Sequence, residues 1–155
     1  MSDNKNLLSL EYIRQRDNKN AVMLRVIKSH LFTEYIMNRI IAEKCPDHNK
    51  ILDDYRSYTY AVKLTLLHCM GIIPNKLNHN LKELNRLRNA FAHNLELDKN
   101  ITINFYENID SNVMHKSAKF EPNFENSVEW LYDSAFIDLA NLAYNLKIKT
   151  HYESK

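Results

Sequence analysis

The chain of 155 residues carries 21 Lys and Arg against 19 Asp and Glu, which gives a formal net charge of +2 at neutral pH. This balance is too even to predict a broad basic surface, so any contact with a nucleic acid has to come from a local site. The sequence contains a single glycine, Gly71. Because phosphate-binding loops, dinucleotide folds and turn-rich β-sandwiches need several glycines for tight turns, the composition argues against all three classes.

Length and hydrophobic content fit one globular domain that spans residues 1–155. No apolar run approaches the roughly 20 residues that a membrane-spanning helix needs, and the polar start, residues 1–6, lacks the apolar core of a secretory signal. Cys45 and Cys69 have no closely spaced partner, and no His or Cys pair has the spacing of a zinc site. We therefore expect no disulfide framework, no metal and no cofactor, and a cytoplasmic location.

The first half of the chain predicts helices separated by proline and glycine. A short helix is expected over residues 7–16 and a long one over residues 20–45, ended by Pro46. Apolar residues at three- and four-residue steps predict the inward face of the long helix: Leu24, Ile27, Leu31, Tyr35, Ile36 and Ile40. A third helix is expected over residues 51–70, followed by Gly71 in the left-handed conformation. Its predicted inward face is Tyr55, Tyr58, Val62, Leu66 and Cys69.

The second half begins with the most regular pattern, a helix over residues 76–94 whose core positions are Leu77, Leu81, Leu84, Leu87 and Phe91, continued by Leu95. Residues 101–106 alternate, and residues 110–112 are typical of a turn, so a small β-hairpin or an extended excursion is expected there. A last helix over residues 124–148 is predicted to bury Val128, Leu131, Phe136, Leu139, Leu142, Ala143 and Leu146. The predicted fold class is therefore all-α, an antiparallel bundle of four or five helices with this excursion before the last one.

Arg88 and His93, near the end of the helix over residues 76–94, are the candidate catalytic pair. Their spacing alone carries little information, because Arg25 and His30 are separated by the same five positions. Arg88 is followed by a polar residue, Asn89, which stands four positions before His93 on the same helical face, where its side chain can bind the imidazole and select a tautomer. Arg88 and His93 lie about 140° apart around the helix and ~7.5 Å apart along it, so they can flank one ligand.

The context of this pair resembles the HEPN superfamily. The matching segments are Tyr60–Pro74, a lysine-bearing helix that ends in a Met-Gly turn, and Leu81–Asn94, which contains the string Arg-Asn-Ala-Phe-Ala-His. The layout is similar to the mannitol-repressor-like branch of that superfamily, and the similarity covers about residues 20–95. The resemblance implies a HEPN-like helical bundle.

The resemblance also implies a homodimer in which two copies of Arg88 and His93 meet in one cleft, because active HEPN proteins are metal-independent endoribonucleases of this kind. One histidine can take the proton of the ribose 2′-OH, and the second copy can protonate the leaving 5′ oxygen. Arginine can bind the phosphate through two hydrogen bonds and stabilise the charge that develops on it. The expected product carries a 2′,3′-cyclic phosphate.

Further residues take supporting roles under the same resemblance. Asn89 assists the catalytic pair, and Glu34 resembles the acidic residue that such bundles often carry on the preceding long helix, where it can brace Arg88. Leu87, Phe91 and the helix that carries Glu34 are expected close to the dimer interface. The prediction is a ribonuclease of the toxin or phage-defence type that acts on RNA, with an antitoxin or another regulatory protein as a possible partner.

Simpler interpretations stand beside this one. A histidine near a helix C-terminus is favoured by the helix dipole. Arg88 can form a surface ion pair with Glu83 or Glu96, and Glu34 can be a solvated helix residue. The alternative function is a non-catalytic, mannitol-repressor-like regulatory module that acts through protein or nucleotide binding. A DNA-binding regulator is disfavoured, because no helix-turn-helix with a basic recognition helix is present.

Overall fold

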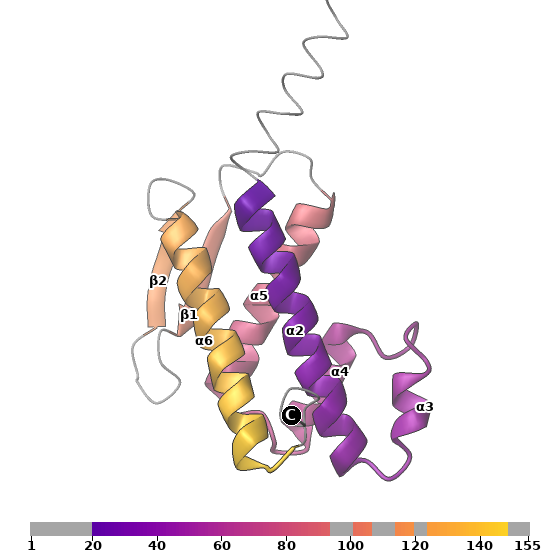
Figure 1. The fold of residues 1–155 in the computed structure, drawn as a ribbon. Helices are drawn as coiled ribbons and strands as arrows, with labels where there is room; N and C mark the ends of the chain where they lie inside the picture. Colours follow the sequence, from indigo (N-terminus) through magenta and orange to yellow (C-terminus); the bar gives the residue numbers. More distant parts are fainter. Residues whose placement is uncertain (1–19, 94–100, 107–113, 120–123, 149–155) are drawn as a thin grey trace, which may run out of the picture.

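The computed structural model describes residues 20–93, 101–106, 114–119 and 124–148, and most of these residues are helical (Figure 1). The described elements are α2 (Asn20–Lys44), α3 (His48–Leu52), α4 (Tyr60–Cys69), α5 (Asn75–His93), β1 (Thr102–Tyr106), β2 (Met114–Lys119) and α6 (Phe124–Asn145). The predominantly helical class is thereby confirmed. The helix expected over residues 7–16 and the turn expected at residues 110–112 lie outside the described residues. Within the described ranges, no helix is long and apolar enough to cross a membrane.

Three long helices form the body of the molecule. α2 packs against both α5 and α6, α5 also packs against α6, and the shorter α4 packs on α2 and α5. α5 runs antiparallel to α2, whereas α2 and α6 lie side by side and run in the same direction (Figure 1). Five of the core positions predicted for α5 are confirmed, because Leu77, Leu81, Leu84, Leu87 and Phe91 are all buried, and the sixth, Leu95, lies outside the described residues. In α6, Val128, Leu131, Leu139 and Ala143 are buried as predicted, and Phe136, Leu142 and Leu146 are partly buried.

The inward face of α2 differs from the predicted one, although the bounds of the helix agree. Leu24 and Leu31 are 49% and 58% exposed. Ile36 and Ile40 are buried as predicted, and Ile27 and Tyr35 are partly buried. The other buried residues lie further around the helix and include polar side chains: Val22, Val26, Ser29, His30, Thr33, Met37 and Ile41. The helix therefore carries apolar residues on two sides, and the sequence pattern selected the wrong one in its first half because polar residues interrupt the buried side.

The helix predicted over residues 51–70 is interrupted, and residues 53–59 separate α3 from α4. Asp54 Oδ1 accepts a hydrogen bond from the Ser57 backbone N–H at 3.1 Å, a side-chain turn that competes with helical geometry. Tyr55, which was expected to face inward, lies in this turn and is 71% exposed. Val62 and Cys69 are also exposed, so the prediction is wrong for three of its five residues, while Tyr58 and Leu66 are partly buried. α4 instead buries Tyr60, Lys63, Leu64 and Leu67.

The segment after α5 forms a strand at the expected place. β1 pairs antiparallel with β2, with Ile103 opposite Ala118 and Phe105 opposite His115. A side-chain amide of α5 binds β1 as well: Asn80 Nδ2 donates to the Tyr106 carbonyl oxygen at 2.8 Å, and Asn80 Oδ1 accepts from the Tyr106 N–H at 2.7 Å. The buried Asn80 amide thus makes the same pair of hydrogen bonds that a neighbouring strand would make, and it fixes β1 to α5.

Two helices end in the same left-handed turn. Gly71 follows α4 with a φ of +73°, as predicted, and Lys147 follows α6 with a φ of +57°. In both turns, the left-handed residue and the one after it donate backbone hydrogen bonds to the last turn of the helix. Glycine adopts this backbone conformation without a steric penalty, whereas a residue with a Cβ atom pays one.

These two turns predict opposite effects of exchanging the residue type. Lys147→Gly is expected to raise the free energy of unfolding by about 0.5–1 kcal/mol, because it removes the strain at a left-handed position. Gly71→Ala is expected to lower it by about 1 kcal/mol, and this loss is purely conformational, since an added Cβ meets no heavy atom within 4 Å. Urea unfolding followed by circular dichroism measures both; a Lys147→Gly protein that is less stable than the wild type contradicts the account.

Candidate functional site

Arg88 and His93 both lie exposed on α5, and His93 is the last residue of the helix. Leu87 and Phe91 on the same stretch are buried, so the backbone that carries the pair is fixed in the core while the pair itself faces solvent. Arg88 Nη1 donates a hydrogen bond to Asn89 Oδ1 at 3.0 Å. The amide of Asn89 therefore orients the guanidinium, a role that the spacing alone did not predict.

Glu34 binds a lysine of α4. Lys63 Nζ donates to Glu34 Oε1 at 3.0 Å, and the two side chains are 5% and 28% exposed. The carboxylate offsets the desolvation of the nearly buried ammonium group. Within the described part of the chain, Glu34 and Arg88 form no ion pair, so the expected bracing of Arg88 by Glu34 is not a direct contact. No pattern in the sequence predicted Lys63 as the partner of Glu34.

His30 is the site residue that the sequence analysis passed over. Its side chain is buried, Nε2 lies 3.0 Å from Asn85 Oδ1, and its ring stacks on Tyr60 with the ring centroids 4.0 Å apart. Asn85 precedes Arg88 by three residues, on the same side of α5. The signal in the sequence is a polar row on each helix, His30 and Glu34 on α2 and Asn85, Arg88 and Asn89 on α5.

The charges around His30 favour its neutral form. Burial lowers the pKa of His30 below its ordinary value of 6.5, and the nearby Arg88 guanidinium lowers it further, while the hydrogen bond to Asn85 and the Glu34 carboxylate act in the opposite direction. Burial also raises the pKa of the Tyr60 hydroxyl. The Arg88 guanidinium thus lies close enough to the His30 imidazole to influence its pKa.

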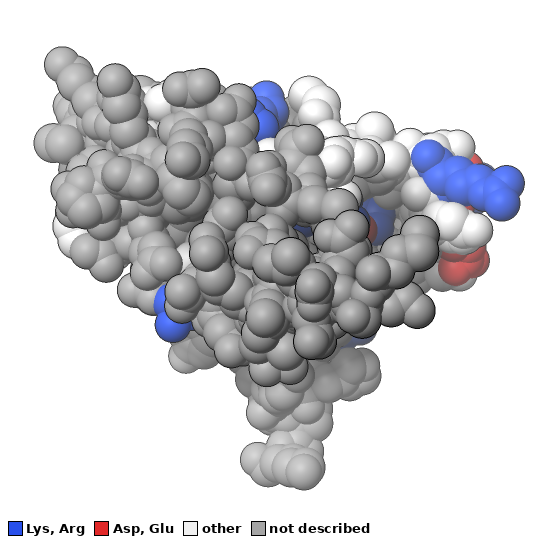
Figure 2. Space-filling view, turned by 90° about the horizontal axis from the view of Figure 1, so that it is seen from above, with Lys and Arg blue, Asp and Glu red and all other residues white. Residues whose placement is uncertain are grey.

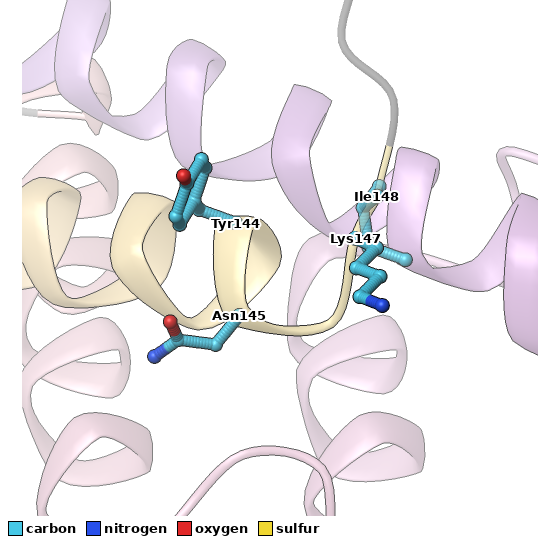
Figure 3. A pocket seen from close by; sticks show the side chains of 4 residues that line it. All are labelled: Tyr144, Asn145, Lys147 and Ile148. Carbon is cyan, nitrogen blue, oxygen red and sulfur yellow. The ribbon is translucent and has the colours of Figure 1, made fainter.

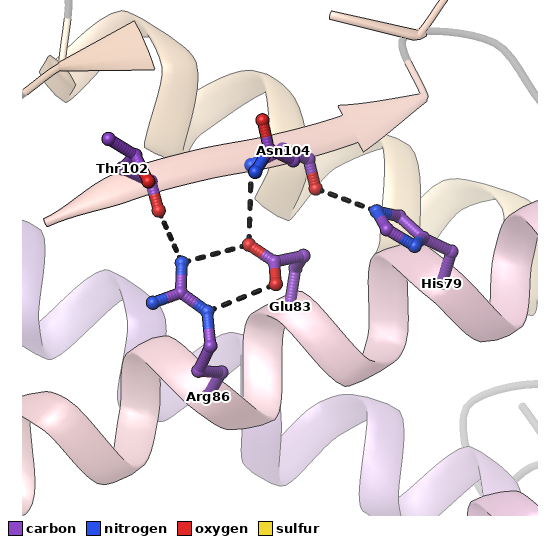
Figure 4. A network of polar contacts seen from close by, with 5 residues as sticks. All are labelled: His79, Glu83, Arg86, Thr102 and Asn104. Carbon is purple, nitrogen blue, oxygen red and sulfur yellow. Dashed lines mark hydrogen bonds and ion pairs between the residues drawn. The ribbon is translucent and has the colours of Figure 1, made fainter. Parts of the chain in front are cut away.

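Arg86, the other arginine near the end of α5, is held in a structural network (Figure 4). Its guanidinium forms two hydrogen bonds to Glu83, at 3.0 and 2.9 Å, and donates a third to the Thr102 carbonyl oxygen. Glu83 also accepts the Asn104 N–H at 3.2 Å, and His79 Nε2 lies 3.0 Å from the Asn104 carbonyl oxygen. The network ties β1 to α5, and it occupies the Glu83 carboxylate that was one expected partner of Arg88.

Arg86 and Arg88 are two positions apart on α5, and residues with this spacing are separated by about 200° around a helix. Their side chains therefore point to nearly opposite sides of α5. The strand side of the helix engages Arg86, and the α2 side carries Arg88. Glu96, the other expected partner of Arg88, lies outside the described residues. Of these two arginines, Arg88 is the one without an ion pair among the described residues, and spacing in the sequence alone could not distinguish them.

Other surface features lie away from this pair. A hollow of about 430 Å³ at the end of α6 is lined by Tyr144, Asn145, Lys147 and Ile148 (Figure 3). In the view of Figure 2, the Lys and Arg side chains that can be seen stand apart and form no continuous basic patch. In the described ranges, no three His, Cys, Asp or Glu side chains gather where they could hold a metal ion.

We compared the chain with protein-family models, with curated proteins and with solved structures. No family model matches it, and neither the curated proteins nor the solved structures give a significant match. The resemblance to the HEPN superfamily therefore depends on the residues quoted from the sequence, and the function has to be argued from the arrangement of the site.

The buried imidazole predicts a pH dependence of stability. Because the pKa of His30 is lowered in the folded protein, the unfolded chain binds a proton at His30 more readily than the folded protein does. The contribution of neutral His30 to the free energy of unfolding is therefore fully present above the unfolded pKa of 6.5 and is lost as the pH falls below that value. His30→Gln keeps a hydrogen-bond donor near Asn85 but does not titrate. Urea unfolding at a series of pH values from about 8 to about 5 is expected to show a steeper loss of stability in the wild type than in His30→Gln; parallel curves contradict the assignment.

Proposed function

We propose that this protein is a metal-independent endoribonuclease of the HEPN type, which acts as a homodimer in the cytoplasm and belongs to a toxin or phage-defence system. Under this proposal, the helices form a HEPN-like bundle in a single domain. The observation that carries it is the exposure of Arg88 and His93 at the end of α5, on a helix whose other sides are held by the leucine core and by the Arg86 network.

The electrostatics around Arg88 support a role in binding phosphate. Among the described residues, the two carboxylates that were expected to pair with Arg88 or brace it bind other cations, Glu83 binding Arg86 and Glu34 binding Lys63. Arg88 is oriented by the neutral amide of Asn89, so its charge is not neutralised by this contact. A guanidinium of this kind can bind a phosphate through two charge-assisted hydrogen bonds.

The proposed reaction uses one copy of His93 as a base and the other as an acid. His93 takes the proton of the ribose 2′-OH, and the 2′ oxygen attacks the phosphorus while the bond to the 5′ oxygen breaks. The partner's His93 donates a proton to that leaving oxygen. Arg88 stabilises the charge on the phosphoryl oxygens, and the products are a 2′,3′-cyclic phosphate and a 5′-hydroxyl end. A two-fold axis supplies both histidines from one position of the sequence.

This mechanism predicts a sharp difference between the two arginines of α5. Arg88→Ala and His93→Ala are expected to reduce RNA cleavage by a factor of about 10² or more, because they remove charge stabilisation and proton transfer. Both residues are exposed, so stability should stay close to that of the wild type. Arg86→Ala is the matched control: it is expected to lower the free energy of unfolding by roughly 1 kcal/mol and to leave cleavage by the folded protein largely intact.

The assay uses purified protein, labelled RNA and excess EDTA, with mass spectrometry of the product ends. Cleavage that persists in EDTA and yields 2′,3′-cyclic phosphate ends supports the proposal. Cleavage that EDTA abolishes contradicts the mechanism. An equal absence of cleavage and of toxicity on expression for the wild type, Arg88→Ala and His93→Ala contradicts the enzyme and leaves the non-catalytic regulatory module.

A further inference from the structure

α5 concentrates positive charge that the chain as a whole lacks. Its 19 residues include four lysines and arginines, Lys76, Lys82, Arg86 and Arg88, and one acidic residue, Glu83. The formal charge of this helix alone is therefore +3, whereas that of the whole chain is +2. α6, which packs against α5, contains four acidic residues and neither lysine nor arginine. The formal charges of the two helices therefore attract a polyanion to α5 and repel it from α6.

Three basic residues of α5 lie along one exposed side of the helix. Lys82, Arg86 and His93 are all exposed, and residues four and eleven positions apart lie within about 40° of one another around a helix. Leu84 and Leu87, which α5 buries in the core, lie about 140–200° away from Lys82. We call the side that is defined by Lys82, Arg86 and His93 the outer face of α5.

The two cations of the outer face other than His93 differ in their partners. The Arg86 guanidinium is bound to both oxygens of Glu83, whose side chain is only 14% exposed and also accepts the Asn104 N–H of β1. The charge of Arg86 is thus compensated. Lys82 forms no hydrogen bond or ion pair with another described residue. Its ammonium group is therefore a cation in solvent that no described carboxylate compensates.

We infer that an RNA strand bound at His93 continues along the outer face of α5 toward the start of the helix, with Lys82 bound to one of its phosphates. This inference rests on the proposed function, because it gives the course of the substrate beyond the bond that is cut. Lys82 and His93 are eleven residues apart, which is about 16 Å along the helix. Since a stacked strand carries one phosphate per ~3.4 Å, Lys82 meets a phosphate no more than about five nucleotides from that bond.

An aromatic and basic cluster lies further along the same course, near the start of α5. His79 is three residues before Lys82, and its ring meets the Tyr106 ring edge-on, with the centroids 5.4 Å apart. Lys76 Nζ lies 5.6 Å from the centroid of the same tyrosine ring. Cations and aromatic rings together are what proteins use to bind single strands without reading their sequence. This cluster is therefore expected to contact the strand beyond Lys82.

RNA binding that does not depend on cleavage tests the inference. The probe is a labelled 2′-O-methyl RNA strand, which stays intact because it lacks the 2′-OH that the proposed reaction needs. Lys82→Ala is expected to raise its Kd about three- to tenfold, and to reduce the slope of log affinity against log salt concentration by about 0.7 for each phosphate contact that is lost. Lys82→Arg is expected to bind like the wild type, because it keeps the charge.

Lys28→Ala is the matched control, because Lys28 is an exposed lysine on a different helix, α2. It is expected to bind the probe like the wild type. Since Lys28 and Lys82 are both exposed, urea unfolding of these variants should match that of the wild type. Wild-type affinity in Lys82→Ala overturns the inference, and so does an equal loss of affinity in Lys28→Ala.

Cleavage of unmodified RNA separates this inference from the proposed function. Lys82→Ala is expected to raise KM and to leave kcat close to that of the wild type, because Lys82 holds the strand away from the reacting bond. The effect on KM should disappear with RNA that extends no more than about two nucleotides on either side of the cut, which is too short to reach Lys82. An equal effect on short and long RNA overturns the inference.

The two measurements fail in different ways. Binding that depends on Lys82 in a protein that cleaves no RNA supports the course of the strand and contradicts the proposed function. Cleavage of long RNA with an unchanged KM in Lys82→Ala supports the proposed function and overturns the course of the strand. A wild-type protein that neither binds the probe nor cleaves RNA contradicts both.

Discussion

The hydrogen bond between His30 and Asn85 joins α2 to α5 beneath the exposed Arg88. The same imidazole stacks on Tyr60, so α4 meets the other two helices at this point. A buried polar side chain is tolerated only when its hydrogen-bonding capacity is used. Burial and the neighbouring guanidinium both lower the pKa of His30 and so favour its neutral form, while the hydrogen bond to Asn85 and the Glu34 carboxylate act in the opposite direction. A charged ring there would set a second cation beside Arg88.

Different faces of α5 make the contacts that hold the candidate site in place. Its leucines fill the core, and its strand side binds β1 through Asn80, Glu83 and Arg86. The ion pair between Lys63 and Glu34 connects α4 to α2. These contacts engage Glu34, Lys63, Glu83 and Arg86 and fix the backbone of α5. Arg88, oriented by Asn89, is exposed and forms no ion pair with another described residue. This arrangement is the physical reason to propose an anionic ligand.

Much of this architecture could be predicted from the sequence, because hydrophobic periodicity is a strong signal where one face of a helix is apolar and the other polar. α5 has that pattern, and its bounds and core residues were predicted correctly. α2 has apolar residues on two sides, and the polar residues His30 and Thr33 interrupt the buried side. The periodic pattern therefore predicted that the exposed leucines face inward. The break between α3 and α4 contains a side-chain hydrogen bond from the Ser57 N–H to Asp54, and no periodic pattern reports such a bond.

The candidate pair could be proposed from Arg88, Asn89 and His93, but their partners could not. Whether Glu34 meets Arg88 or Lys63 depends on how α4 packs against α2, which is a tertiary contact. The most direct measurement is the distance between spin labels at Ala92→Cys, an exposed position between Arg88 and His93, in the proposed homodimer of a chain that also carries Cys45→Ser and Cys69→Ser. α5 has 19 residues and is about 28 Å long. The account predicts a label separation shorter than that length; a longer separation places the two sites at opposite ends of the assembly and contradicts it.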